Sequence, residues 1–78
     1  MYQGYSNYET WAAILYIGNE QKLYKDLRAY CHAQAYKASP AHIAVRVLLY
    51  WPNGHEDLTK TRYLSVNWDE VAEWIQND

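Results

Sequence analysis

The 78-residue sequence has no phenylalanine, a single cysteine, three glycines and two prolines. The lone cysteine, Cys31, excludes an intramolecular disulfide and is typical of a protein in a reducing compartment or one that is indifferent to redox state. No charged and apolar leader opens the chain, and no apolar run approaches the roughly 20 residues of a membrane span. We therefore expect a soluble, cytoplasmic protein that does not associate with membranes.

Nine tyrosines and four tryptophans make up the aromatic residues. A chain of this length has room for one domain, so we expect residues 1–78 to form a single helical unit. Such a small domain buries only about 60% of the surface that its unfolded chain exposes. Each buried ring removes roughly 150–250 Å² from water, so a few rings can supply a core that short aliphatic side chains could not.

The formal net charge is only −2, which is too small to indicate a general attraction to nucleic acid or membranes. The charges are unevenly distributed, however. Between residues 21 and 46 the only acidic residue is Asp26, and the lysines and arginines are Lys22, Lys25, Arg28, Lys37 and Arg46. Residues 66–78 carry no lysine or arginine, and their acidic residues are Asp69, Glu70, Glu73 and Asp78. The distribution predicts one basic helix face and one acidic terminal helix.

Residues 7–17 are predicted to form the first helix. Ser6 and Glu9 have the spacing of a capping box, in which the two side chains accept hydrogen bonds from amides at the helix start. Trp11 and Leu15 follow at helical spacing, so we expect Trp11 to be buried at the centre of the apolar face. Gly18 then ends the helix, because glycine readily adopts the left-handed conformation of a C-terminal cap.

Three further helices are predicted at residues 20–37, 40–51 and 67–76. Ser39 followed by Pro40 is a strong start signal for the middle one, and Asn67 caps the last one. Residues 40–51 are apolar around most of the helix circumference, which is typical of a central helix covered by the others.

A strand is the alternative for residues 43–51, since their β-branched and apolar side chains alternate. A hairpin over residues 43–66 would then make the fold α+β. The Ser-Pro start favours a helix, so we predict an all-α bundle of about four helices. Residues 52–66 lack a clear periodicity and are expected to be a long loop.

Both ends of the chain carry recognisable motifs. The first reads NYETW, then LYIGNE and LY, and its matching positions are Asn7, Glu9, Thr10, Trp11, Leu15, Tyr16, Ile17, Asn19, Glu20, Leu23 and Tyr24. The second comprises WPNG and VNWDEVAEWI. The sequence resembles a family of small uncharacterised proteins from bacteriophages, plasmids and some bacterial and archaeal genomes, with an [NS]-x-E-T-W start, an L-[WY]-I-x-N-[DE]-x-x-L-Y pattern and a V-[DN]-W-x-E-[IV]-A terminus.

This resemblance covers about half of the chain. Gly18 stands where the family commonly has an aspartate, and the middle helix has no recognisable match. The resemblance implies a small helical domain associated with mobile genetic elements. The family has no assigned activity, so the resemblance implies no catalytic residue.

The residues that could hold a metal ion are Cys31, His32, His42 and His55. Adjacent helical positions diverge by about 100°, so Cys31 and His32 cannot easily share one ion, and no pair with zinc-ligand spacing accompanies them. Nothing near Cys31 in the sequence would activate it as a nucleophile, and a small core residue is the simpler interpretation. We therefore predict neither a metal site nor a cofactor.

The run His55-Glu56-Asp57 could perform acid–base chemistry in the long loop. Three polar residues after a turn are more often a solvated turn. An enzyme is consequently the third hypothesis for this protein, and we predict a protein that is not an enzyme.

One face of the second predicted helix carries basic side chains and an aromatic ring: Lys22, Lys25, Arg28, His32 and Tyr36. Such a face can follow a phosphate backbone, with the ring as a stacking surface. It can also be simply solvated, or it can contact an acidic protein or the acidic last helix of a second copy.

Trp74 lies at the border of the apolar face of the last helix, and Tyr2 and Tyr5 precede the first helix. Tryptophan is enriched in interface hot spots, so we expect Trp74 to be partly exposed and to contact a partner, with Tyr2 and Tyr5 as further candidates. The alternative is a ring folded over its own core rim. The leading prediction is a small non-catalytic protein-interaction module, with a regulatory or anti-defence role in a mobile element. The alternative is a weak nucleic-acid-binding protein that uses the basic face.

Overall fold

The computed structural model describes residues 1–33 and 38–77, and most of them are helical. The α-helices of this described part are α1 (Tyr8–Asn19), α2 (Gln21–Ala33), α3 (Pro40–Tyr50) and α4 (Trp68–Asn77). Between α3 and α4, strands β1 (Gly54–His55) and β2 (Leu58–Thr59) form an antiparallel hairpin, and the 3-10 helix η1 (Lys60–Ser65) follows. The predicted small helical bundle is confirmed.

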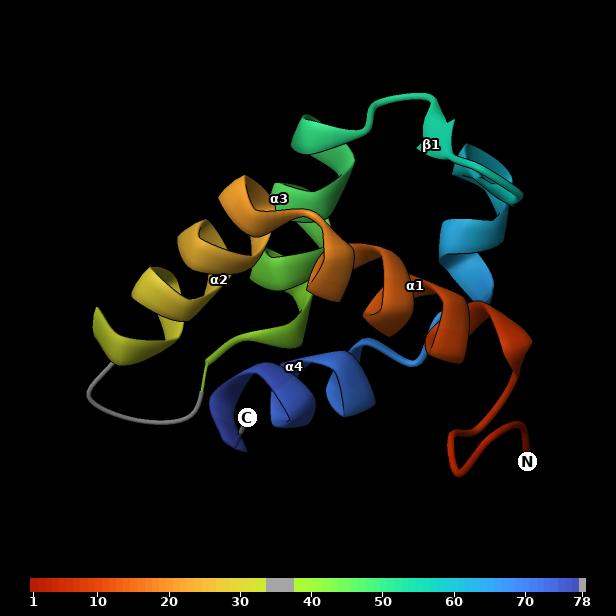
Figure 1. Cartoon of the computed structure of the whole chain (residues 1–78), viewed down its shortest axis with the longest axis horizontal. Helices are drawn as coiled ribbons and strands as arrows, with labels where there is room; N and C mark the ends of the chain where they lie inside the picture. The colour runs from red at the N-terminus through yellow and green to blue at the C-terminus, as the bar shows by residue number, and fades with distance from the viewer. Residues whose placement is uncertain (34–37, 78) are drawn as a thin grey trace.

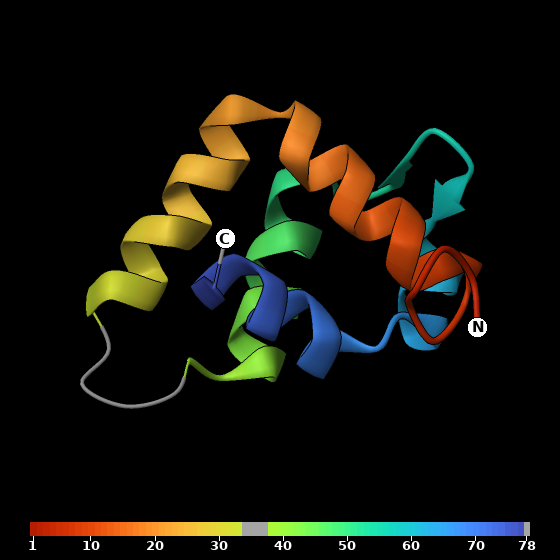
Figure 2. The same ribbon diagram turned by 60° about the horizontal axis from the view of Figure 1, so that its bottom comes forward.

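The helices α1 and α2 meet at an angle, and α3 and α4 lie between the arms of this angle (Figures 1 and 2). Helix α4 contacts all three other α-helices. The β2 strand and η1 pack against α1 instead, on the side that points away from α2 (Figure 1). The N-terminal segment reaches the start of α4, although the two are far apart in the sequence, because the Ser6 amide donates a hydrogen bond to the Glu70 carboxylate.

One cluster of buried side chains joins all four α-helices, the hairpin and η1. Helix α2 contributes Leu23, Leu27, Tyr30 and Cys31, which recur every three or four residues and therefore share one face of the helix. The fully buried members of the cluster from the other elements include Ile17, Ile43, Val47, Leu58, Val71 and Ile75. Trp68 and Trp74 pack against this cluster without being fully buried.

The strand alternative for residues 43–51 is wrong, because α3 spans them almost completely. The Ser39 hydroxyl accepts a hydrogen bond from the His42 amide at 3.3 Å, and Pro40 occupies the first turn, as the Ser-Pro pair predicts. Residues 52–66, which we expected to be a loop, contain the small hairpin and η1.

The first helix starts and ends later than the sequence indicates. Asn7, and not Ser6, is the N-cap of α1, because its side-chain oxygen accepts from the Thr10 amide at 2.9 Å. Gly18 lies inside the helix, which continues to Asn19, and Glu20 follows as the C-cap. The next helix starts at Gln21 and is described as far as Ala33, so residues 34–37 of the predicted helix lie outside the described residues.

The prediction that Trp11 is a buried core residue is wrong. The buried residues of α1 are Thr10, Ala12, Ala13, Ile14 and Ile17, whereas Trp11 is only partly buried and lies outside the core cluster. Its ring contacts those of Tyr2 and Tyr8, with centroid distances of 5.2 and 5.7 Å. We call these three residues the aromatic corner. On the buried side of α1, Ala12 and Ala13 are fully covered, and such small side chains allow neighbouring elements to approach the helix closely.

Helix α3 is not covered on all sides, contrary to the prediction of a central helix. Val45 and Leu49 are 52% and 76% exposed. Part of the apolar surface of this helix is therefore left uncovered by the rest of the described structure.

Candidate functional site

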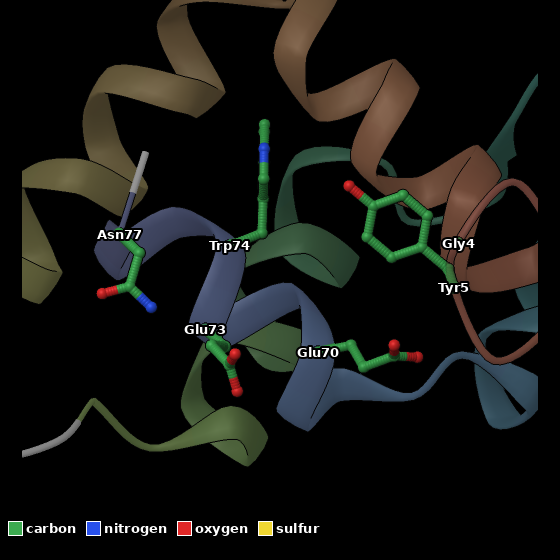
Figure 3. Close-up of a pocket in the computed structure, with 6 residues that line it drawn as sticks. All are labelled: Gly4, Tyr5, Glu70, Glu73, Trp74 and Asn77. Carbon is green, nitrogen blue, oxygen red and sulfur yellow. The ribbon is translucent and has the colours of Figure 1, made fainter.

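A groove of about 410 Å³ lies between the N-terminal segment and α4. Its lining residues are Gly4, Tyr5, Glu70, Glu73, Trp74 and Asn77 (Figure 3). The structure thus brings together Trp74 and Tyr5, which the sequence suggested separately as contact residues. We call this feature the α4 groove.

A tight turn places Tyr5 at the α4 groove. Tyr2 and Tyr5 exchange backbone hydrogen bonds of 2.7 and 2.8 Å, and Gln3 and Gly4 between them have φ angles of 51° and 89°. Two successive positive φ angles are the signature of a two-residue hairpin turn, and glycine favours the second of them. The Tyr2 ring belongs to the aromatic corner, so only Tyr5 of the two candidate tyrosines lines the groove.

Glu70 connects the two sides of the α4 groove. Its carboxylate accepts a hydrogen bond of 2.9 Å from the backbone amide of Ser6. The amide of Glu70 itself donates to the side chain of Asn67 at 3.2 Å, which is the predicted N-terminal cap of the last helix. Because the backbone amide and the carboxylate of Glu70 are both hydrogen-bonded, the N-terminal segment is fixed against the first turn of α4.

A second bridge connects the starts of α1 and α4. The hydroxyl of Thr10, which is fully buried, donates to the Asn7 side chain at 2.6 Å and accepts from the Asn67 amide at 2.8 Å. The Asn7 side chain donates in turn to the Ser65 carbonyl at 2.7 Å. The two helix caps therefore form one hydrogen-bonded unit beside the groove.

Trp74 occupies the junction of α1, α2 and α4. A Cβ atom placed on Gly18 would lie 3.7 Å from the Cη2 and Cζ2 atoms of Trp74, so the ring covers the face of α1 that lacks a side chain. The Tyr24 ring on α2 lies 5.8 Å from it, centroid to centroid. Trp74 is partly exposed, as expected, and its remaining surface faces the groove, where Figure 3 shows Tyr5 opposite it.

The chemistry of the α4 groove is acidic and aromatic. Glu70 and Glu73 supply carboxylates, and the rings of Trp74 and Tyr5 supply faces with partial negative charge. A cation near such rings is attracted by them, and tryptophan gives the strongest interaction. The groove can therefore accept a positively charged group together with its apolar stem.

The basic face of α2 differs from the prediction at its centre. Lys22, Lys25 and His32 are exposed, but the Arg28 guanidinium donates from Nη1 to the carbonyl oxygen of Ile75, in the last turns of α4. Basic side chains commonly satisfy carbonyls at a helix C-terminus in this way. Arg28 is therefore bound to its own fold, and Tyr36 lies outside the described residues.

The run His55-Glu56-Asp57 takes part in contacts that the sequence does not indicate. The Asp57 carboxylate accepts hydrogen bonds from the hydroxyls of Tyr8 and Tyr16, the latter at 2.6 Å. His55 stacks on Trp51 with ring centroids 4.4 Å apart and meets the Tyr16 ring edge-on at 5.1 Å. No local pattern predicts these contacts, because the tyrosines belong to α1 and the others follow α3.

These hydrogen bonds perturb the titration of the residues involved. The two tyrosine hydroxyls lower the pKa of Asp57, and the Asp57 carboxylate raises the pKa of Tyr16 and of Tyr8. The carboxylate is therefore a weaker base and the hydroxyls are weaker acids than usual. Such a cluster is suited to fixing the hairpin on α1 and poorly suited to proton transfer near neutral pH.

Cys31 is buried, and desolvation raises the pKa of its thiol. A raised thiol pKa reduces the thiolate that a nucleophile or a metal ligand requires. Within residues 1–33 and 38–77, no three histidine, cysteine, aspartate or glutamate residues are placed so that they could hold a metal ion. None of the helices described has the length and apolarity needed to cross a membrane.

The fold and the groove define a small helical domain with one acidic, aromatic groove. The whole chain, residues 1–78, matches the model of a family of unknown function (DUF7249), and the protein belongs to that family. Searches of curated proteins and of solved structures find no match.

Proposed function

We propose that this protein is a non-catalytic interaction module that binds a basic segment of a partner protein in the α4 groove. The observation that carries the proposal is the convergence of two carboxylates and two aromatic rings in one groove. A lysine or arginine side chain matches both features, because its stem packs on rings and its charged group meets carboxylates. Trp74 and Tyr5 are of the residue types that dominate binding energy at interfaces.

The setting of this interaction is part of the same proposal. The NYETW and VNWDEVAEWI motifs support a protein of a phage or another mobile element, which acts on a host protein or one of the element's own proteins. The single cysteine supports a cytoplasmic location. A regulatory or anti-defence role fits such a protein.

A peptide titration tests the proposal. We expect a fluorescently labelled peptide of alternating lysine and glycine to bind with a change in tryptophan emission, and the matching glutamate–glycine peptide not to bind. Glu73→Gln removes a carboxylate of the groove and should weaken binding several-fold. Asp69→Asn is the matched control, since it removes one negative charge from an exposed position of α4 outside the groove.

The outcome of this comparison is decisive in both directions. Equal weakening by Glu73→Gln and Asp69→Asn would show that the peptide senses only net charge and would contradict a specific groove. The nucleic-acid alternative is tested with a labelled oligonucleotide at low salt, because phosphate contacts weaken steeply as salt rises. Oligonucleotide binding that Lys22→Gln and Lys25→Gln abolish, with no peptide binding, would favour the basic face of α2.

A further inference from the structure

The outward face of α3 is an exposed apolar stripe. Ala41, Val45 and Leu49 follow one another at intervals of four residues, and all three are exposed. The solvent-facing side of a surface helix normally carries charged or polar side chains. No aspartate, glutamate, lysine or arginine interrupts this stripe, which shares no residue with the α4 groove.

The stripe is complementary to itself. Its side chains increase in size along the helix, from alanine through valine to leucine. In an antiparallel pair of α3 helices with Val45 at the two-fold axis, the Leu49 of each copy lies over the Ala41 of the other. A large side chain then meets a small one at both ends, as close packing between helices requires.

The arginine next to the centre of the stripe is neutralised within each copy, which permits two identical surfaces to meet there. Arg46 pairs with Asp26 at 3.0 Å, and its guanidinium lies 4.8 Å from the centre of the Tyr30 ring. The positive charge of Arg46, beside Val45 at the centre of the stripe, is therefore compensated within each copy. Beside Leu49, a hollow between α2 and α3 combines apolar and charged side chains, and its lining residues are Lys22, Leu23, Asp26, Arg46, Leu49 and Tyr50.

We infer that α3 is the contact surface of a symmetric, antiparallel homodimer. A charged partner would find no counter-charge on the stripe, whereas a second copy presents a surface of the same polarity and the matching order of side-chain sizes. The inference is independent of the function proposed for the α4 groove, because the two surfaces share no residue. Dimerisation would give the protein two grooves per particle.

The dimer is expected to be weak. A standard stable interface buries roughly 800 Å² per partner, and one helix stripe of three side chains with its border covers less than that. The dimer should therefore dissociate on dilution, and the appropriate experiment is sedimentation velocity of the full chain from about 10 μM to 1 mM. We expect the sedimentation coefficient to rise with concentration.

Charged substitutions locate the interface. Leu49→Asp should abolish the concentration dependence of the sedimentation coefficient, since it places a charge against Ala41 of the second copy. The substitution should leave the monomer folded, because the Leu49 side chain is 76% exposed. Leu64→Asp is the matched control, because Leu64 is 92% exposed and lies on η1. It should sediment like the unmodified chain.

Two results would overturn the inference. One is a chain that stays monomeric up to 1 mM; the other is a dimer that Leu49→Asp and Leu64→Asp affect equally. Added salt provides a further discrimination, because apolar contacts persist when charges are screened. A dimer that dissociates in high salt would instead indicate contact between the basic face of α2 and the acidic α4 of another copy.

Discussion

Trp11 and Trp74 lie on the contacting helices α1 and α4, and both are partly buried, but their surroundings differ. Trp11 contacts the other rings of the aromatic corner, Tyr2 and Tyr8, at the outside of the fold. Trp74 packs against the core cluster and against the bare face of Gly18. The difference shows that a partly buried tryptophan can either pack with other rings at the surface or fill the junction between helices.

The largest effect is expected for Trp74→Ala. Removing a tryptophan ring from a core costs about 3–5 kcal/mol of unfolding free energy, and partial exposure places this one at about 3 kcal/mol. Thermal or urea unfolding of the variant measures it. A loss smaller than that of Trp11→Ala would reverse the comparison and restore the assignment that the sequence indicates.

Gly54→Ala should be nearly as damaging, at about 2 kcal/mol. Gly54 has a φ of 89°, and an added Cβ would lie 2.5 Å from the Leu58 carbonyl oxygen. The hairpin that it shapes carries Asp57, which binds Tyr8 of the aromatic corner. Gly4→Ala is the matched control, because Gly4 has the same φ but no atom within 4 Å of the added Cβ, so its loss should be about 1 kcal/mol. Equal losses in urea unfolding would show that the clash at Gly54 relaxes away.

Trp11→Ala is expected to cost about 1–2 kcal/mol, because its two ring pairs contribute roughly 0.5–1.5 kcal/mol each and the exposed part of the ring contributes little. Trp11→Phe should recover most of this loss by retaining ring contacts. Chemical unfolding at neutral pH measures both variants. A loss near 3 kcal/mol for Trp11→Ala would mean that the aromatic corner stabilises the fold as much as the core does.

The smallest effect concerns pH. The pKa of Asp57 is lowered in the folded protein, so its carboxylate stabilises the fold above the unfolded pKa, near 4, and this contribution disappears as the pH falls through the lower folded value. The melting temperature of Asp57→Asn should therefore lie below that of the unmodified chain at pH 7, and the gap should close below about pH 4. A constant gap from pH 7 to pH 2 would contradict the role of the carboxylate charge.

Local sequence signals predicted the helices well where a cap and its helix are contiguous. Ser39 with Pro40 and Asn67 with Glu70 mark the starts of α3 and α4, because capping requires only residues within one turn. The start of α1 was misassigned to Ser6 because Ser6 and Asn7 are both good caps. The choice depends on Asn67, whose amide binds Thr10 next to the Asn7 cap.

The candidate site was predictable only in part. Trp74 and Tyr5 could be singled out as aromatic residues at the edges of helices, but nothing in the sequence shows that a turn at Gly4 brings Tyr5 opposite Trp74. The basic face looked continuous because helical spacing places Arg28 beside Lys25. The hydrogen bond from Arg28 to the Ile75 carbonyl depends on how α2 packs on α4, and helical spacing does not predict that packing.

By itself, the sequence determined that the chain is helical, where α3 and α4 begin, and which face of α2 is buried, because capping and periodicity act over a few residues. Only the tertiary structure decided which side of α1 faces the core. That helix has apolar side chains on two sides, and the approach of α2, α4 and η1 selected the side with Ala13 and Ile17 over the side with Trp11 and Leu15. Close packing favours small side chains where helices meet, so the largest ring was left at the surface.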